Sequence, residues 1–254
     1  MANTDDSWDK IGKADPYYGV LSHERFRRSS MVDDISLEFF KSGEEHVQRV
    51  FETVRAHIDA DFSPQSALDF GCGVGRIAIP LARRIAKVVA ADVSGAMLSE
   101  AGRNCAEQNI DNVQLIKSDD TLSAVPSNLE FIHSFIVFQH IPTIRGLGIL
   151  QHMLRLLADK GVGALHFTFA RHASKYRIFL QRMRGSIPLA NGFYNLLCGR
   201  EFSHPYMEMN LYEMNRILDV LYQNGCHDLH IRFSDHDGFI GAMLYFKKRA
   251  LLLL

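Results

Sequence analysis

The residues whose types and spacing most clearly suggest ligand binding lie in the segment Ala67–Arg76. There a short apolar run carries Asp69 near its end and is followed by Gly71, Gly73 and Gly75. Backbone N–H groups at the start of a helix lack partners within the helix, and glycine lets a ligand approach that backbone closely. The segment is therefore typical of a loop that binds a nucleotide-type ligand, although glycines between a strand and a helix are also ordinary turn residues. The dinucleotide fingerprint needs a further glycine where Arg76 stands, which disfavours a nicotinamide cofactor.

A second acidic residue supports the ligand-binding interpretation. Asp92 ends the next apolar run, Lys87–Ala91, which is predicted to be a buried strand. A carboxylate about twenty residues after the glycine loop, at the tip of the second strand, is placed to accept hydrogen bonds from two ribose hydroxyls. Two parts of one nucleoside site therefore coincide in the sequence.

These segments resemble the class I S-adenosylmethionine-dependent methyltransferases. Leu68–Gly75 is similar to the family's first motif, Val89–Ser94 to its ribose-binding second strand, and Asn112–Asp119 to its third strand. The resemblance covers residues 63–169 well and residues 210–248 more loosely. It implies S-adenosylmethionine as the cofactor and S-adenosylhomocysteine as the product.

The resemblance also implies roles for individual residues. The glycine loop would hold the methionine end of the cofactor, Asp92 the ribose and Asp119 the adenine amine. Met97 would wall the adenine, but its spacing also fits a core residue. A flap formed by the N-terminal segment would fold over the cofactor. The expected cofactor-binding residues are Asp69, Gly71, Cys72, Gly73, Asp92, Val93, Met97, Asp119, Phe138, Tyr18 and Arg28.

The candidates for the chemical step follow the predicted central strand, Leu129–Phe138. Ligands of open α/β sheets bind at the carboxyl ends of the strands, so Phe138, Gln139 and His140 are expected to face the reacting centre. Methyl transfer to a hydroxyl needs a general base, and histidine titrates near neutral pH. His140 is therefore the candidate base, although a histidine at such a junction can also be a cap or a packing residue. The expected substrate-binding residues are Gln139, Tyr17, Lys175 and Arg177.

The elements that must position these residues alternate between strand and helix from residue 63 onward. This pattern predicts an α/β, Rossmann-like, doubly wound, mostly parallel seven-stranded sheet with a C-terminal antiparallel hairpin. Helices are expected over residues 33–60, 76–86 and 143–160, and a fifth strand over Gly163–Phe169. Residues 1–62 are predicted to form an N-terminal flap and helices, and residues 63–254 the methyltransferase domain with a lid insertion at about 170–209.

The first part of the predicted lid is basic and amphipathic. It carries Arg171, Lys175, Arg177, Arg182 and Arg184, with no acidic residue before Glu201. Such a segment predicts a contact with an anionic acceptor or with a membrane surface, or else only a solvated helix face. Of these, an anionic small molecule or a lipid-linked glycan is the acceptor that the charge favours.

Composition limits the remaining possibilities. The chain has 254 residues, 47% of them hydrophobic, and a formal net charge of −1, which fits one globular domain and gives no sign of a nucleic-acid partner. The four cysteines are scattered, as expected of free thiols in the cytoplasm, and no apolar run is long enough to span a membrane. No metal site is expected, because turn chemistry explains the histidines and acids near His236. The oligomeric state is open.

The sequence therefore predicts an enzyme that transfers a methyl group from S-adenosylmethionine to an oxygen or nitrogen atom of a small-molecule or glycan acceptor. A non-catalytic module that binds the same cofactor is the main alternative. A nicotinamide-dependent oxidoreductase is a weaker one, because of Arg76 and because no Tyr-x-x-x-Lys motif stands on a matching helix.

Overall fold

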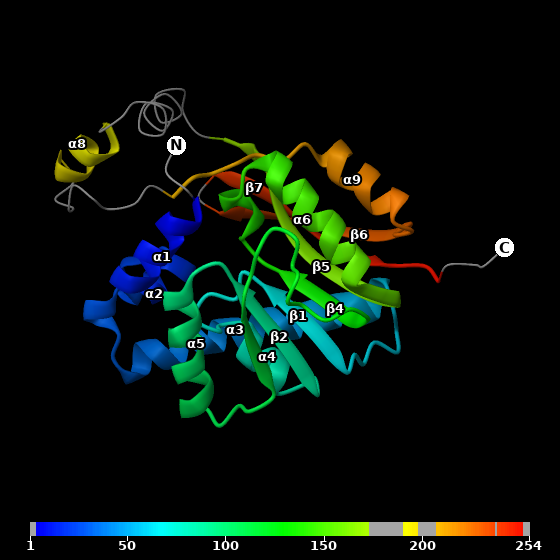
Figure 1. Ribbon diagram of the computed structural model, residues 1–254, viewed down its shortest axis with the longest axis horizontal. Coiled ribbons are helices and arrows are strands. Elements are labelled where there is room, and N and C mark those ends of the chain that lie inside the picture. Colours follow the sequence, from blue (N-terminus) through cyan, green and yellow to red (C-terminus); the bar gives the residue numbers. More distant parts are fainter. Residues whose placement is uncertain (1–3, 173–189, 198–206, 237, 251–254) are drawn as a thin grey trace.

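The computed structural model describes residues 4–172, 190–197, 207–236 and 238–250. In this part of the chain a seven-stranded sheet with the order β3-β2-β1-β4-β5-β7-β6 forms the centre of the molecule (Figure 1). Neighbours among the first five strands are parallel, and β7 is antiparallel to both β5 and β6. The predicted fold class is confirmed. The strands are β1 (Ser66–Phe70), β2 (Lys87–Asp92), β3 (Val113–Lys117), β4 (Leu129–Ser134), β5 (Leu157–Arg171), β6 (Asp228–His236) and β7 (Phe239–Lys247).

The strand order reverses between β1 and β4. The chain runs outward from β1 through β2 to β3 and then returns to place β4 on the other side of β1. The middle strands are almost fully buried because helices cover both faces, which is why they appear in the sequence as continuous apolar runs. The loops after β1 and β4 diverge at this reversal, which is where open α/β sheets bind ligands.

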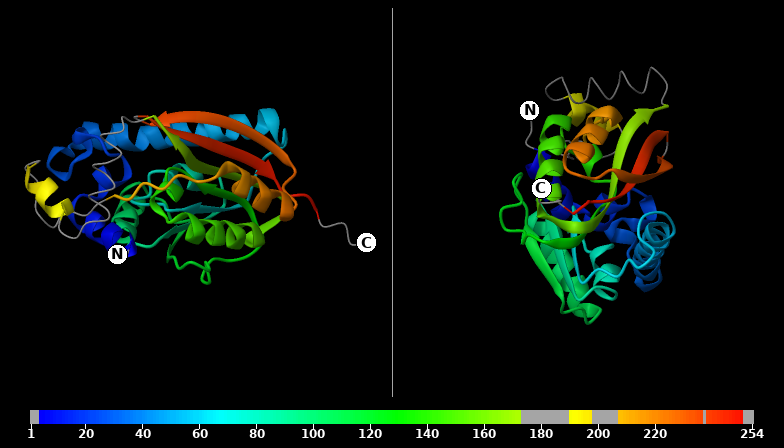
Figure 2. Two further views of the ribbon diagram at one scale, coloured as in Figure 1. Left: turned by 90° about the horizontal axis from the view of Figure 1, so that it is seen from above. Right: turned by 90° about the vertical axis from the view of Figure 1, so that its right-hand side faces the viewer.

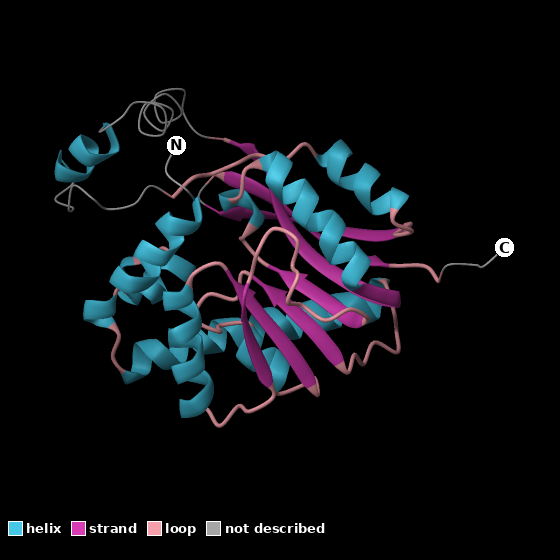
Figure 3. Cartoon of the chain, in the orientation of Figure 1, coloured by secondary structure: helices cyan, strands magenta, loops and turns pink. Residues whose placement is uncertain are grey.

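Helices lie on both faces of the sheet (Figures 2 and 3). On one face, α3 (Asp33–His57) and α4 (Ala78–Ala82) bury apolar side chains such as Val47, Phe51 and Leu81 in one core with Phe131 of β4. On the other face, α6 (Thr143–Leu156) and α9 (Met214–Gln223) form the larger core, with Ile149, Leu150 and Ile217. The short helix α8 spans Ala190–Leu197.

The N-terminal segment gathers beside α5 (Gly95–Glu107), close to the carboxyl ends of the strands (Figure 1). Its elements share a third apolar core with the sheet domain, in which Ile11 and Phe39 accompany Val74 and Met97. The division of the chain at residue 62 remains a prediction. The elements are α1 (Thr4–Ala14), α2 (Pro16–Val20), η1 (Glu24–Phe26) and η2 (Arg28–Ser30).

Several predicted boundaries were wrong. The helix expected to reach residue 160 ends at Leu156, because Leu157 is 2% exposed and pairs with Leu129 in the parallel ladder. The strand expected to reach Phe138 ends at Ser134, and Ile136 then adopts a left-handed φ of +61°. Tertiary pairing and one tight turn therefore override the apolar pattern at both positions. Likewise, α4 is shorter than the helix expected over residues 76–86.

The predicted lid lies mostly outside the described residues, and so do Lys175 and Arg177. No helix in the described ranges is long and apolar enough to cross a membrane.

Candidate cofactor-binding and active site

A cavity of about 580 Å³ lies at the carboxyl ends of the central strands. It extends from the ends of β1, β2 and β3 to the turn between β6 and β7, where Phe239 lines it. Residues of α1, α2 and η1 close it on the side of the N-terminal segment. The structure thus brings together eight of the predicted site residues as lining, namely Gly71, Gly73, Asp92, Val93, Met97, Asp119, Gln139 and His140.

The glycine loop is tightly enclosed. Gly71 and Gly73 have φ values of +74° and +54°, which side chains rarely adopt. A Cβ on Gly71 would lie 2.3 Å from a methyl group of Val137, and one on Gly73 would lie 2.5 Å from a methyl group of Val20. The N–H of Gly71 donates to the Ala91 carbonyl at 2.8 Å. The absence of side chains therefore keeps the cavity open where the loop meets its opposite wall.

Asp92 is held by two backbone donors. The Gly73 N–H donates to its Oδ2 and the Ser94 N–H to its Oδ1, both at 2.9 Å. Burial raises the pKa of Asp92 to about 6, because the ionised carboxyl loses hydration. The carboxyl is thus fixed at the tip of β2, facing the cavity, in the position expected for a ribose acceptor.

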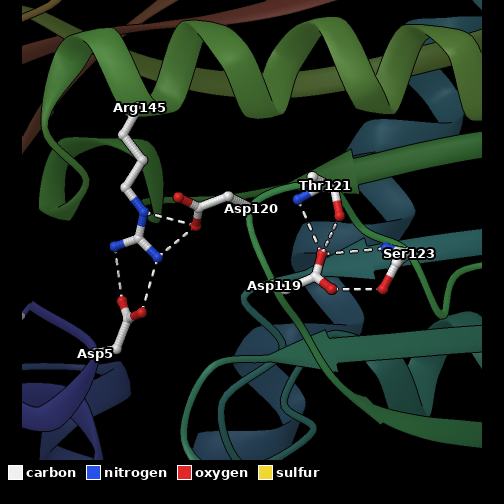
Figure 4. A network of polar contacts seen from close by, with 6 residues as sticks. All are labelled: Asp5, Asp119, Asp120, Thr121, Ser123 and Arg145. Carbon is white, nitrogen blue, oxygen red and sulfur yellow. Dashed lines mark hydrogen bonds and ion pairs between the residues drawn. The ribbon is translucent and has the colours of Figure 1, made fainter.

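Asp119 lies in a turn whose polar groups point toward it (Figure 4). The Thr121 N–H and hydroxyl donate to Oδ1 at 2.9 and 2.8 Å, and the Ser123 hydroxyl donates to Oδ2. Hydrogen bonds from Ser123 and Thr121 hold the pKa of Asp119 well below its usual range. Asp119 lines the cavity. Its contact with an adenine amine remains a prediction.

Helix α1 closes one side of the cavity through polar contacts near its start and in its middle. At its start, Asp5 accepts two hydrogen bonds from Arg145 of α6, at 2.7 and 2.8 Å, and Arg145 also pairs with Asp120 (Figure 4). Further along, Asp9 accepts from the Ser94 hydroxyl and the Ala96 N–H, each at 3.2 Å. Arg145 thus ties the N-terminal helix to α6 and to the loop after β3.

The ring of His140 is fixed by defined hydrogen bonds. Its Nδ1 lies 2.8 Å from the Glu208 carbonyl oxygen, which only accepts, so Nδ1 carries the proton. Its Nε2 therefore accepts from the Gln139 amide at 3.1 Å, while the Gln139 oxygen accepts from Thr168 at 2.7 Å. Burial lowers the pKa of His140 to about 4. The imidazole is neutral at neutral pH, and Trp8 packs against it edge-on with ring centroids 4.9 Å apart.

Other predicted residues lie elsewhere. Phe138 is fully buried in the core against Phe167, 4.4 Å between centroids, and does not line the cavity. Tyr17 and Tyr18 do not line it either, because the Tyr17 hydroxyl lies 2.9 Å from Glu100 and the Tyr18 ring lies under Arg27. These three expectations gain no support from the cavity.

The remaining predicted residues divide into two groups. Asp69 and Cys72 line a smaller cavity of about 30 Å³ behind the glycine loop. Arg28 begins η2, and the placement of its side chain is not described. Among the described residues there is no group of three metal-ligating side chains.

The sequence did not indicate that Asp5 and Arg145 close the cavity, because these residues form an ion pair although they are 140 positions apart in the sequence. Sequence reasoning also missed a buried polar row behind the loop, formed by His46, His133 and Arg76 together with Asp69. One signal was present for the row, since a charged residue directly after a buried glycine loop must find a polar environment.

The chemistry of the site fits a cofactor with a nucleoside and an amino-acid end. Asp92 offers a carboxylate for the ribose, and the glycine loop leaves space that a Cβ would fill. Behind the loop, Asp69 Oδ2 and Arg76 Nε are buried polar atoms with no hydrogen-bond partner in the described part of the chain. Paired opposite charges of this kind suit a zwitterion.

Comparison with known proteins agrees with this geometry. Residues 67–161 match a family described as a methyltransferase domain. Magnesium protoporphyrin IX methyltransferase of Arabidopsis thaliana is 28% identical over 155 residues, which cover 58% of this chain and 47% of the relative. A 23S rRNA (uracil-C5)-methyltransferase of Aeromonas hydrophila is 30% identical over 102 residues, or 38% of this chain and 23% of the relative. The chain therefore spans less than half the length of these two relatives.

A solved structure matches nearly the whole chain. Magnesium protoporphyrin IX methyltransferase from Synechocystis PCC 6803, with bound S-adenosylmethionine, superposes with a TM-score of 0.60 at 19% identity, over 98% of both chains. At this identity the likeness concerns the fold. Residues 67–161 of this chain therefore match the methyltransferase-domain family, and the chain as a whole shares its fold with solved S-adenosylmethionine-dependent methyltransferases.

Proposed function

We propose that this protein is an enzyme that transfers the methyl group of S-adenosylmethionine to an oxygen or nitrogen atom of a small-molecule or glycan acceptor. The observation that carries the proposal is the continuity of the 580 Å³ cavity, which joins the glycine loop and Asp92 to a second, mainly apolar end. Gly71, Gly73 and Asp92 would hold the cofactor, with Asp119 beside the adenine. A site for cofactor alone would not need the second end.

The residues of the second end indicate the acceptor. Phe239, Met207 and Met209 are among its apolar lining residues, and such side chains suit an apolar or aromatic body. At the same end, the Arg171 guanidinium lies 5.5 Å from the centroid of the Phe239 ring. These contacts support an acceptor with an apolar body and an anionic group, in keeping with the basic segment that follows Arg171 in the sequence. Lys175 and Arg177 remain proposed contacts.

The chain's own residues would supply alignment and proton removal. The cofactor supplies an activated methyl group on a sulfonium, and catalysis then depends mainly on bringing the acceptor atom into line. Gln139 and His140 belong to the 3-10 helix η3 (Phe138–His140), which follows β4, and both line the cavity. We assign His140 Nε2 as the acceptor of the proton that a hydroxyl or ammonium acceptor loses, which requires the Gln139 amide to release that nitrogen.

The setting we propose is the cytoplasm. The cysteines within the described residues, Cys72, Cys105 and Cys226, are buried free thiols, as expected in a reducing compartment. Peripheral contact of the basic segment with a membrane surface stays part of the proposal.

Calorimetric titration with S-adenosylmethionine, S-adenosylhomocysteine and NADH tests the cofactor. We expect selective binding of the first two, lost in Asp92→Ala and kept in Asp111→Ala, which removes an exposed carboxyl outside the cavity. Binding of NADH alone would contradict the proposal.

A methyl-labelled cofactor incubated with cell extract, later separated into small molecules, RNA and protein, tests the acceptor. Label in the small-molecule or glycan fraction supports the proposal. Label in RNA would favour the activity named for the rRNA methyltransferase relative. Binding without transfer to any fraction would indicate a non-catalytic module.

A further inference from the structure

A row of buried polar side chains lies behind the glycine loop and is not used by the proposed chemistry. Asp69 of β1 and His133 of β4 are register partners in adjacent parallel strands, and His46 reaches them from α3. All three are buried, with 2%, 1% and 7% exposure. Burial of this many titratable groups is costly unless they hold a polar partner in place.

The hydrogen bonds of the row fix the orientation of Asp69. His133 Nδ1 lies 3.0 Å from Asp69 Oδ1, and because a carboxylate only accepts, this nitrogen carries the proton. His133 Nε2 lies 2.9 Å from His46 Nε2, so the second ring holds the first in place. Burial and the nearby His133 hold the pKa of His46 well below its usual range, which keeps His46 neutral. Oδ1 is therefore occupied by His133.

Asp69 and Arg76 both line a small cavity of about 30 Å³. Asp69 Oδ2 and Arg76 Nε are both buried without a hydrogen-bond partner in the described residues, whereas Arg76 Nη1 donates to Ser42 at 3.3 Å. The space is large enough for one group of the size of a water molecule or an ammonium. Two residues of opposite charge, Asp69 and Arg76, therefore line one small cavity, and each has a buried polar atom without a partner.

The small cavity lies next to the larger one, because the two share lining residues. Val20, Gly71, Phe135 and Ile136 line both. A ligand whose nucleoside lies at Asp92 can therefore place a charged end group beside Asp69. Helix α3 presses closely on this region, since a Cβ on Gly43 would lie 2.0 Å from the Arg76 carbonyl oxygen.

We propose that His46 and His133 are positioning residues, which hold Asp69 as the acceptor for the ammonium of the cofactor's amino-acid end, with Arg76 beside it for the carboxylate. This inference rests on the proposed function. Neither histidine touches the cofactor. Both act through Asp69, whose free oxygen would swing out of place without the His133 hydrogen bond.

The test compares two ligands that differ only at the relevant end. S-adenosylhomocysteine carries the amino-acid group, and 5′-methylthioadenosine lacks it. We expect His133→Phe to weaken the binding of S-adenosylhomocysteine about tenfold or more, as for the loss of a hydrogen bond to a charged group. The same substitution should change the affinity for 5′-methylthioadenosine by less than about twofold. His133→Asn, whose amide can donate to Asp69 from a similar position, should restore most of the affinity.

Two further variants keep the inference falsifiable should His133→Phe fold poorly. The side chain of His46→Gln can still donate to His133, so this variant should keep its affinity for both ligands. His46→Phe should lose affinity for S-adenosylhomocysteine but not for 5′-methylthioadenosine. His166→Phe is the matched control, because His166 of β5 is also buried, with 1% exposure, but lies outside the row. This substitution should change the affinities for the two ligands equally, if at all.

Equal losses for the two ligands in His133→Phe and His46→Phe would show a merely structural role and overturn the inference. Unchanged affinities would overturn it as well. If the unaltered protein binds both ligands with equal affinity, the amino-acid site fails while the cofactor proposal stands. If it binds neither, the proposed function and this inference fall together.

Discussion

At the scale of single residues, the pKa of Asp92 gives a prediction about pH. The carboxyl is protonated below about pH 6 and ionised above it, because burial raises its pKa to about 6. Ribose hydroxyls donate, so the ionised form binds the cofactor better. Affinity should therefore rise with pH and be about tenfold weaker near pH 5 than near pH 7. Calorimetry of S-adenosylhomocysteine across this range measures the effect.

Asp92→Asn is the control for this pH dependence. The amide does not titrate, so the variant should bind weakly and equally at both pH values. A pH dependence that survives in the variant would assign the effect to another group.

A second prediction at this scale concerns His140. With a pKa of about 4, lowered by burial, its neutral form predominates above that pH, so kcat should rise through about pH 4 and then stay level toward neutrality. Loss of a general base typically costs 10²-fold or more, so we expect His140→Ala to lower kcat by about 100-fold with little change in cofactor affinity. Steady-state kinetics on the identified acceptor measures both quantities. A small loss of kcat with a raised KM would instead indicate that His140 only orients the acceptor.

At the scale of elements, the contact between α1 and α6 gives a prediction about access to the cavity. Arg145 is 23% exposed at its side chain and pairs with Asp5 and Asp120. Partly exposed ion pairs contribute up to about 1 kcal/mol each and weaken with salt. We expect Arg145→Met to speed dissociation of S-adenosylhomocysteine a few-fold and to abolish the salt dependence of that rate.

Stopped-flow displacement at low and high salt measures this rate. Arg103→Met removes an ion pair with Glu100 on α5 and serves as the matched control, with an expected rate equal to that of the unaltered protein. If both variants behave alike, the pairing of α1 with α6 does not control release.

At the scale of the whole molecule, the sequence was sufficient for the sheet and for placing Gly71, Gly73 and Asp92 around one cavity. Parallel strands buried on both faces are apolar runs, and the glycines and Asp92 stand at the ends of those runs, so local pattern predicts both. The closure by Arg145 and the row of His46 and His133 join residues far apart in the chain, which no local pattern reports. The core position of Phe138 likewise depends on its contact with Phe167, which lies far away in the sequence.

The same long-range contacts predict how the molecule responds to its cofactor. A ligand in the cavity would lie between the strand ends, α1 and the segment at Met207, because residues of all three line the cavity. At about 100 times its Kd, S-adenosylhomocysteine should add about 2.7 kcal/mol of stability, or roughly 5–10 °C in Tm. Hydrogen exchange should slow in residues 4–14 in parallel, because α1 can then open only after the ligand leaves. Asp92→Asn should show neither change at that concentration. A rise in Tm without protection of α1 would mean that the ligand binds while the N-terminal helix remains free to open.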